Sequence, residues 1–244
     1  MNTPQITQVI RRSDQGATRP FVCRADDGYV YYVKGRSAST GERIREWMGT
    51  HLAQAFGLPV PPMRLLEVPS ALYKSLDTET ARDLGHGYAV GSRQVQAVSE
   101  LRFEEIPLIP ANTQQAILLF DYWVQNEDRT LSSLGGNPNL LLNKATSALF
   151  AIDYNLILPG MFDAALFWQT HVFRHVFRQP VEQAQQQQFV HQMQQALSQW
   201  ETAWQQLPDE WLEENEASKV FDETAIKQRL EYDQQGAIWR HFHP

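Results

Sequence analysis

Short apolar runs separated by turn signals dominate the first hundred residues, and they predict β-strands. Residues 17–35 contain two such runs on either side of Asp27-Gly28, and the second run, YVYYV, has the aromatic and β-branched residues that strands favour. The same pattern predicts strands at 63–68 and 88–95, with a polar, turn-rich segment at 69–87 between them. This part of the chain is therefore expected to be rich in β-structure.

Apolar residues at spacings of three and four predict helices elsewhere in the chain. One helix is expected from residue 40 to a stop at Gly57, and another at 113–126. A glutamine-rich helix at 181–207 carries one apolar face, which we interpret as part of a hydrophobic core. Residues 99–112 contain prolines and several carboxylates, which is typical of a connection.

This order of elements predicts an α+β fold with two lobes. Residues 1–100 are expected to form a small β-rich N-terminal lobe, and residues 101–244 a larger, mainly helical C-terminal lobe. A cleft between two such lobes is a common place for a ligand.

Composition narrows the class of protein without identifying it. The chain has 244 residues, of which 43% are hydrophobic, and its net charge of -7 gives no indication of a nucleic-acid or membrane surface. Cys23 is the single cysteine, so an internal disulfide is excluded and a reducing compartment is favoured. The first residues lack the apolar core of a signal peptide, and no apolar run is long enough to span a bilayer. We therefore expect a cytoplasmic protein.

Three polar side chains near the middle of the chain are candidates for a metal site and an acceptor site. Asp128 follows the second predicted helix, and Asn139 and Asp153 lie in two short strands expected at 139–143 and 148–153. Two such strands would form a hairpin, which would let the amide and the carboxylate share one ion. Carboxylate and amide oxygens are ligands that Mg²⁺ prefers. A metal ion would also compensate the cost of a carboxylate in an apolar strand.

A lysine and a glutamate in the N-terminal half complete the set of candidates. Lys34 ends the strand YVYYVK, and Glu46 lies in the following helix, where it could hold the lysine; Glu42, one turn earlier on the same face, is the alternative. Phosphoryl transfer requires a cation on the phosphates, metal ions held by oxygen ligands, and a carboxylate near the acceptor hydroxyl. The chain offers each of these parts.

These features occur within a series of motifs whose order resembles the HipA-like kinase family. The motifs fall between about residues 10 and 160 and read GATRPF, YVYYVKG, REWMGTHLAQAFGLPVPP, YAVGSR, DYWVQNEDRT with GGNPNLLL, and FAIDYNLIL. This bacterial family is related to the Ser/Thr kinase HipA and is more distantly similar to phosphatidylinositol 4-kinases. The resemblance implies a protein-kinase-like fold. It also implies ATP- and Mg²⁺-dependent transfer of the γ-phosphoryl group to a hydroxyl, with Ser or Thr of a protein as the expected acceptor.

The resemblance also implies roles for individual residues. Asp128 would be the catalytic aspartate, Asn139 and Asp153 the metal ligands, Lys34 the lysine that contacts the phosphates, and Glu46 its ion-pair partner. The loop 13–19 would lie over the phosphates, and the segment 88–95 would lead to the adenine site. The residues expected to contact the nucleotide are Gly16, Thr18, Lys34 and Arg93.

The sequence departs from the family pattern in the segment around the catalytic aspartate. Ten residues lie between Asp128 and Asn139, against about four in eukaryotic kinases. The extra residues make Asn137 an alternative to Asn139 as the amide ligand. Tyr154-Asn155 stands where eukaryotic kinases have Phe-Gly, so no mobile inactive state is inferred from that motif.

Two further expectations concern partners and the competing function. The chain is expected to lack the N-terminal subdomain of HipA, which a partner protein could supply. The alternative to a kinase is a pseudokinase or nucleotide-binding regulatory partner without phosphotransfer. His171 and His175 have the spacing of two metal ligands on one helix, but without a third ligand nearby we interpret them as helix surface.

Overall fold

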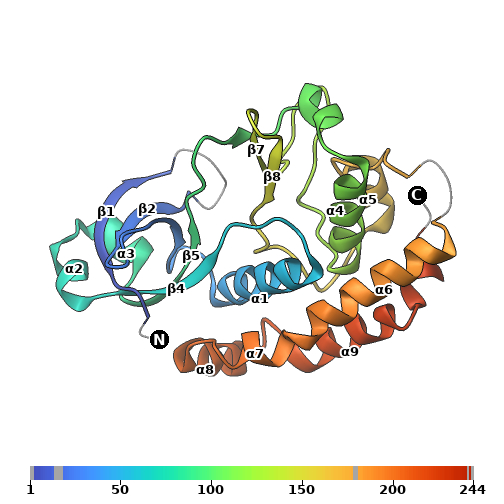
Figure 1. The fold of residues 1–244 in the computed structure, drawn as a ribbon. Coiled ribbons are helices and arrows are strands. Elements are labelled where there is room, and N and C mark those ends of the chain that lie inside the picture. Colours follow the sequence, from blue (N-terminus) through green and yellow to red (C-terminus); the bar gives the residue numbers. More distant parts are fainter. Residues whose placement is uncertain (1–2, 14–18, 178–180, 241, 243–244) are drawn as a thin grey trace.

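An antiparallel sheet occupies the N-terminal part of the chain, and helices make up most of the C-terminal part (Figure 1). The structure is a computed structural model, and it describes residues 3–13, 19–177, 181–240 and 242. This arrangement confirms the predicted α+β class. The boundary at residue 100 between the two lobes stays a prediction.

The first sheet has five strands in the order β1-β2-β3-β5-β4, and every neighbouring pair is antiparallel. Its strands are β1 (Ile6–Arg12), β2 (Phe21–Ala25), β3 (Val30–Lys34), β4 (Met63–Val68) and β5 (Gly87–Arg93). The predicted turn at Asp27-Gly28 joins β2 to β3. Gly28 has a φ of +85°, which a residue without a Cβ adopts freely, and the Asp27 carboxylate accepts the Tyr29 N–H at 3.0 Å.

Helix α1 (Thr40–Phe56) follows β3 and ends at Gly57, as the sequence predicts. Its first turn is closed by a capping box between Ser39 and Glu42, and Gly57 is left-handed with its N–H directed to the last turn. The apolar stripe of α1 packs into the large C-terminal core rather than into the core of the sheet. Trp47 donates its ring N–H to the Ala203 carbonyl at 2.8 Å, which ties α1 to the helices that end the chain.

Two short helices replace the loop expected between β4 and β5. They are α2 (Ser70–Ser75) and α3 (Thr78–Leu84). The Asp77 side chain accepts the backbone N–H groups of Glu79 and Thr80 and so begins α3. Apolar side chains of this segment cover one part of the sheet, which explains why a polar stretch is helical.

A second, three-stranded antiparallel sheet connects to the helical region. Its order is β6-β7-β8, and its strands are β6 (Ser99–Glu100), β7 (Leu140–Asn143) and β8 (Ala148–Ala151). Between β6 and β7 the chain forms a 3-10 helix (Phe103–Leu108) and α4 (Ala111–Trp123). The hairpin β7-β8 is therefore present as predicted, although both strands are shorter than expected.

The remaining elements are helical and cover α1 and α4. They are α5 (Ala164–Thr170), α6 (Gln183–Ser198), α7 (Trp200–Trp204), α8 (Asp209–Ser218), α9 (Glu223–Gln234) and a 3-10 helix (Ala237–Arg240). Figure 1 shows α6 and α7 beside α1, and α9 along the other side of α6. The predicted glutamine-rich helix is divided into α6 and α7 at Gln199, and its buried members, among them Met193 and Trp200, lie in the core. Within the described residues, no helix is both long and apolar enough to cross a membrane.

Candidate active site

Lys34, Glu46 and Asp153 meet where β3, α1 and the end of β8 come together. The Lys34 ammonium lies 2.8 Å from a Glu46 carboxylate oxygen and 2.6 Å from one of Asp153. The same Glu46 oxygen accepts the backbone N–H of Tyr154 at 3.1 Å. Glu46 therefore fixes both the lysine and the backbone just after Asp153. Glu42, the alternative partner for the lysine, is engaged in the capping box with Ser39.

Burial and charge act in opposite directions on this cluster. Burial alone would lower the pKa of Lys34, but the carboxylates of Glu46 and Asp153 together outweigh it and raise that pKa. Burial also raises the pKa of Glu46; Lys34 opposes this rise, and Asp153 adds to it. One ammonium is thus shared by the two acidic side chains.

Asp128 lies after α4, and two amides of the same loop bind its carboxylate. Asn137 and Asn139 donate their side-chain N–H groups to the same Asp128 oxygen, Oδ2, at 2.8 and 2.9 Å. The Asp128 backbone N–H donates to the Asn126 side chain at 3.2 Å. The carboxylate is therefore held through one oxygen, and no hydrogen bond to the other appears within the described part of the chain. The two amides that compete as metal ligands in the sequence both orient Asp128.

Asn139 and Asp153 lie just outside the strands in which the sequence places them. β7 begins at Leu140, β8 ends at Ala151, and the Ile152 N–H donates to the Asn139 carbonyl at 3.0 Å. Both residues are left-handed, with φ values of 48° and 61°. Such a backbone is costly for a residue with a Cβ, and it is typical of functional sites. Because of this left-handed backbone, neither side chain follows the alternating pattern of strand residues. Both lie at the same end of the hairpin.

A buried arginine connects the Asp128 loop to the backbone at Asn139 and at Ile152, the residue before Asp153. Arg129 is fully buried, and its guanidinium donates to the carbonyls of Pro138, Asn139 and Ile152. Its charge is balanced by Asp121 in the last turn of α4, at 2.6 Å. Burial opposes ionisation of Asp121, but Arg129 outweighs it and lowers the pKa of that carboxyl. Arg129 therefore fixes the backbone on either side of the hairpin end.

His171 corrects the expectation that the pair at 171 and 175 lies on a helix surface. α5 ends at Thr170, and His171 is 1% exposed with its ring against Asp121, at 3.0 Å from Nε2. Its Nδ1 accepts the Phe173 backbone N–H at 3.1 Å, so the ring is neutral and Nε2 carries the proton. Asp121 also accepts the Asn126 side-chain N–H at 2.9 Å, so both of its carboxylate oxygens accept hydrogen bonds. The sequence offered only one signal for this network, a carboxylate within an apolar helix face.

The neutral state of His171 predicts an acid-sensitive fold. Burial lowers the pKa of His171 below its ordinary value, so below about pH 6.5 the unfolded chain binds a proton that the folded chain does not. Stability should therefore fall with decreasing pH, by up to about 1.4 kcal/mol per pH unit from this group. We expect urea unfolding between pH 7.5 and 5.5 to show a smaller pH dependence for His171→Gln than for the wild type. The same substitution at the exposed His175 is the control, and equal pH dependence in all three proteins would contradict the prediction.

The hairpin end offers two oxygen atoms of the types that bind a divalent metal ion. With Asn139 donating through its nitrogen to Asp128 and Asp153 binding Lys34 through one oxygen, an amide oxygen and a carboxylate oxygen have no hydrogen bond within the described residues. These are the oxygen ligands that Mg²⁺ accepts alongside water and phosphate. Among the described residues, no three His, Cys, Asp or Glu side chains gather as a metal site. The pair predicted from the sequence would not form such a group, because one of its two residues is an asparagine.

The residues predicted to contact the nucleotide are only partly placed. Gly16 and Thr18 lie outside the described residues. Arg93 stacks on the Tyr29 ring, 3.3 Å from its centroid, at the end of the β3-β5 pair away from Lys34. Lys34 pairs with Val90, so Arg93 stands about 10 Å further along the strand. The structure does not bring Arg93 into the cluster around Lys34.

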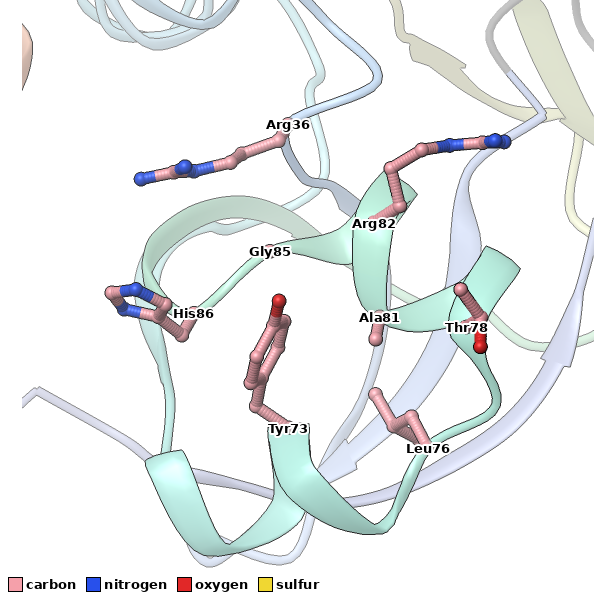
Figure 2. A pocket seen from close by; sticks show the side chains of 8 residues that line it. All are labelled: Arg36, Tyr73, Leu76, Thr78, Ala81, Arg82, Gly85 and His86. Carbon is pink, nitrogen blue, oxygen red and sulfur yellow. The ribbon is translucent and has the colours of Figure 1, made fainter.

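Neither of two cavities in the structure involves the candidate site. One, of about 450 Å³, lies beside α2 and α3, and Figure 2 shows Arg36, Arg82, Tyr73 and His86 around it. Another, of about 240 Å³, lies at the end of α1 near Gly57. None of the predicted site residues lines either cavity. The candidate site is therefore defined by its ion pairs and hydrogen bonds and not by a cavity.

Comparison with known proteins agrees with this geometry. The fold is similar to the crystal structure of the Helicobacter pylori proinflammatory kinase CtkA, with a TM-score of 0.51, 11% sequence identity, and 96% of this chain and 94% of that chain covered. This similarity defines the class as a kinase-like fold. The family model of the HipA-like kinases matches residues 6–242, so the chain belongs to the HipA-like kinase family. No curated protein matches the sequence. Membership implies a kinase-type function that uses ATP and a metal ion in general.

Proposed function

We propose that the protein transfers the γ-phosphoryl group of ATP to the hydroxyl of a Ser or Thr residue in a protein, with Mg²⁺ as the metal. The observation that carries this proposal is that two hydrogen-bonded pairs lie at the same end of the β7-β8 hairpin. In one pair Lys34 binds Asp153, and in the other Asn139 orients Asp128. Phosphoryl transfer depends mostly on positioning and charge neutralisation, and this arrangement supplies both.

Asp128 is the residue that we propose to act on the acceptor. Two amides hold its Oδ2, so its Oδ1 is free to accept the hydroxyl proton. The hydroxyl oxygen then forms a bond to the γ-phosphorus, the bond from that phosphorus to the bridging oxygen breaks, and ADP leaves with the bridging oxygen. The proton stays on Asp128 until solvent or the product takes it. Holding the carboxylate in one orientation lowers the entropic part of the barrier.

Lys34 and Glu46 are proposed to position the nucleotide. The elevated pKa of Lys34, against the effect of burial, keeps the ammonium charged near neutral pH. When phosphates compete for it, Glu46 continues to hold its amine in place because it is also fixed by the Tyr154 N–H. Asn139 and Asp153 would hold Mg²⁺, which supplies charge neutralisation on the phosphates.

We expect the Asp153→Asn variant to bind ATP but to lose the effect of Mg²⁺ on that binding. In the wild type, ATP with Mg²⁺ should raise the melting temperature more than ATP alone. The expected size follows from mass action, since a ligand at a hundred times its Kd stabilises the folded state by about 2.7 kcal/mol. The variant loses a charged metal ligand, so the added effect of Mg²⁺ should disappear and transfer should fall by about 100-fold or more. Thermal-shift titrations and a labelled-ATP transfer assay measure both.

Asp209→Asn, in the exposed first turn of α8, is the matched control and should behave as the wild type. Retention of the full Mg²⁺ effect by Asp153→Asn would remove Asp153 from the metal site. Mg²⁺-dependent ATP binding by the wild type without transfer to itself, casein or peptides would instead favour a nucleotide-binding protein without phosphotransfer.

A further inference from the structure

The cavity beside α2 and α3 is lined by basic and hydroxyl side chains. Among the described residues, its lining contains Arg36, Arg82, His86, Tyr73 and Thr78 and no acidic side chain, and its volume is about 450 Å³. This volume falls within the range of roughly 300–1,000 Å³ that is typical of sites for small organic ligands. The whole chain has a net charge of -7, so a cavity with this lining differs from the average surface and favours an anionic ligand.

Arg36 is held in place at this cavity, although its side chain makes no ion pair or hydrogen bond to any residue that the structure describes. Its stem lies over Gly85, where an added Cβ would be 2.6 Å from Cγ and 2.8 Å from Cδ of Arg36. Its backbone N–H donates to the Leu84 carbonyl at 3.2 Å. Because the guanidinium has fixed support and no partner, its donors are available to an anion.

Tyr73 and His86 add two further donors at the same cavity. Their rings are in edge-to-face contact, with centroids 5.4 Å apart, and neither side chain has a hydrogen bond within the described part of the chain. Figure 2 shows the Tyr73 hydroxyl directed toward Gly85, the residue over which Arg36 lies. A phenol hydroxyl and an imidazole can each donate a hydrogen bond to an anion. The cavity therefore offers three donors that the fold itself does not use.

Two carboxylates close to the cavity are engaged elsewhere. Asp83 binds Arg82 at 2.8 Å and Arg12 at 2.5 Å, so one carboxylate is shared by two arginines. Glu210 of α8 accepts the Tyr88 backbone N–H at 3.3 Å. In the part of the chain that the structure describes, neither carboxylate forms an ion pair with Arg36. The positive charge of Arg36 is thus left for a ligand.

We propose that this cavity binds a phosphate monoester, with Arg36, Tyr73 and His86 as donors to the phosphate group. A phosphate monoester presents three acceptor oxygens and close to two negative charges near neutral pH, whereas a carboxylate presents two oxygens and one charge. The cavity is larger than a phosphate group, so the organic part of the ligand lies against Leu76 and Ala81. None of the residues proposed for phosphoryl transfer lines this cavity, so the inference goes beyond the proposed function.

Isothermal titration calorimetry of the full chain with O-phosphoserine tests this site. A non-hydrolysable ATP analogue and Mg²⁺ are present at saturation, so that the ligand cannot give a signal by entering the nucleotide site. We expect O-phosphoserine to bind, and serine and aspartate to give no signal at the same concentration. Arg36→Gln should weaken binding by about tenfold or more, because charge-assisted hydrogen bonds to the phosphate are lost, and Tyr73→Phe by about three- to tenfold.

Arg24→Gln is the matched control, because Arg24 is an exposed arginine on β2 of the same sheet and does not line the cavity. Its affinity for O-phosphoserine should equal that of the wild type. Arg36→Gln should keep the wild-type melting temperature, since no contact within the described residues is lost. A short phosphoserine peptide identifies the source of the phosphate: tighter binding of the peptide assigns the cavity to a phosphorylated protein segment, and tighter binding of free O-phosphoserine assigns it to a small metabolite.

Three results would overturn the inference. The first is the absence of binding by O-phosphoserine and by the phosphopeptide at millimolar concentration. The second is equal weakening by Arg36→Gln and Arg24→Gln, which would show general charge attraction instead of a site. The third is equal affinity for aspartate and O-phosphoserine, which would exclude phosphate as the recognised group. A chain that fails to transfer phosphate from ATP would contradict the proposed function and leave this titration unaffected.

Discussion

Asp128→Asn is expected to lower phosphotransfer by about 10²–10⁴-fold while ATP binding stays at the wild-type level. The amide oxygen can still accept from Asn137 and Asn139, so the loop should keep its geometry. The nitrogen that replaces Oδ1 cannot accept a proton from the acceptor hydroxyl. The loss should therefore appear in kcat and not in the KM for ATP.

Single-turnover transfer and an ATP titration on the same preparation measure this effect. Asp209→Asn serves as the matched control, because Asp209 is exposed and lies far along the chain from Asp128. Wild-type transfer by Asp128→Asn would show that Asp128 does not act on the acceptor. Loss of ATP binding together with transfer would show that the residue supports the nucleotide site instead.

Asp121→Asn is expected to lower the free energy of unfolding by about 3–5 kcal/mol, because it leaves the buried charge of Arg129 without its partner. Arg129 and Asp121 are both completely buried and lie 2.6 Å apart. Among the described residues, Asp121 is the only carboxylate that accepts a hydrogen bond from Arg129, and one Arg129 nitrogen has no hydrogen bond at all. Urea unfolding measures the loss, and Asp209→Asn should change stability by less than about 0.5 kcal/mol.

A double-mutant cycle separates the ion pair from packing. Asp121→Asn combined with Arg129→Gln should lose less than the sum of the two single losses, by about 1–3 kcal/mol, because no unpaired charge remains. Phosphotransfer should stay low in the double variant even where the chain is folded, because the bonds from Arg129 to the carbonyls of Asn139 and Ile152 are gone. Additive losses would show that the two residues act independently.

The sequence predicted which residues belong to the candidate site, but it did not predict how they are arranged. Lys34, Glu46, Asp128, Asn139 and Asp153 were all named from motifs, and the structure brings them into two connected clusters. The sequence left Asn137 and Asn139 as competitors for one role, whereas both bind Asp128. It also placed Asn139 and Asp153 inside strands, because period-two patterns do not report a left-handed turn at a strand end.

His171 shows why the rest was not predictable. Its spacing from His175 suggested a helix surface, yet it lies beyond the end of α5 and against Asp121, fifty residues away in the chain. Local periodicity carries no information about a contact between such distant segments. The same limit applied to 69–87, where polar residues predicted a loop and tertiary packing on the sheet stabilised two short helices.

Local chemistry in the sequence determined where many of the elements begin and end. Asp27-Gly28 made a turn, Gly57 ended α1, and the apolar periods of 113–126 produced α4, because each depends on backbone freedom or on neighbours within one or two turns. Only the tertiary structure decided that Lys34 binds Asp153 and that Arg129 is buried. Those contacts require charged groups from distant segments to be desolvated together, and their stability depends on partners that no local pattern specifies.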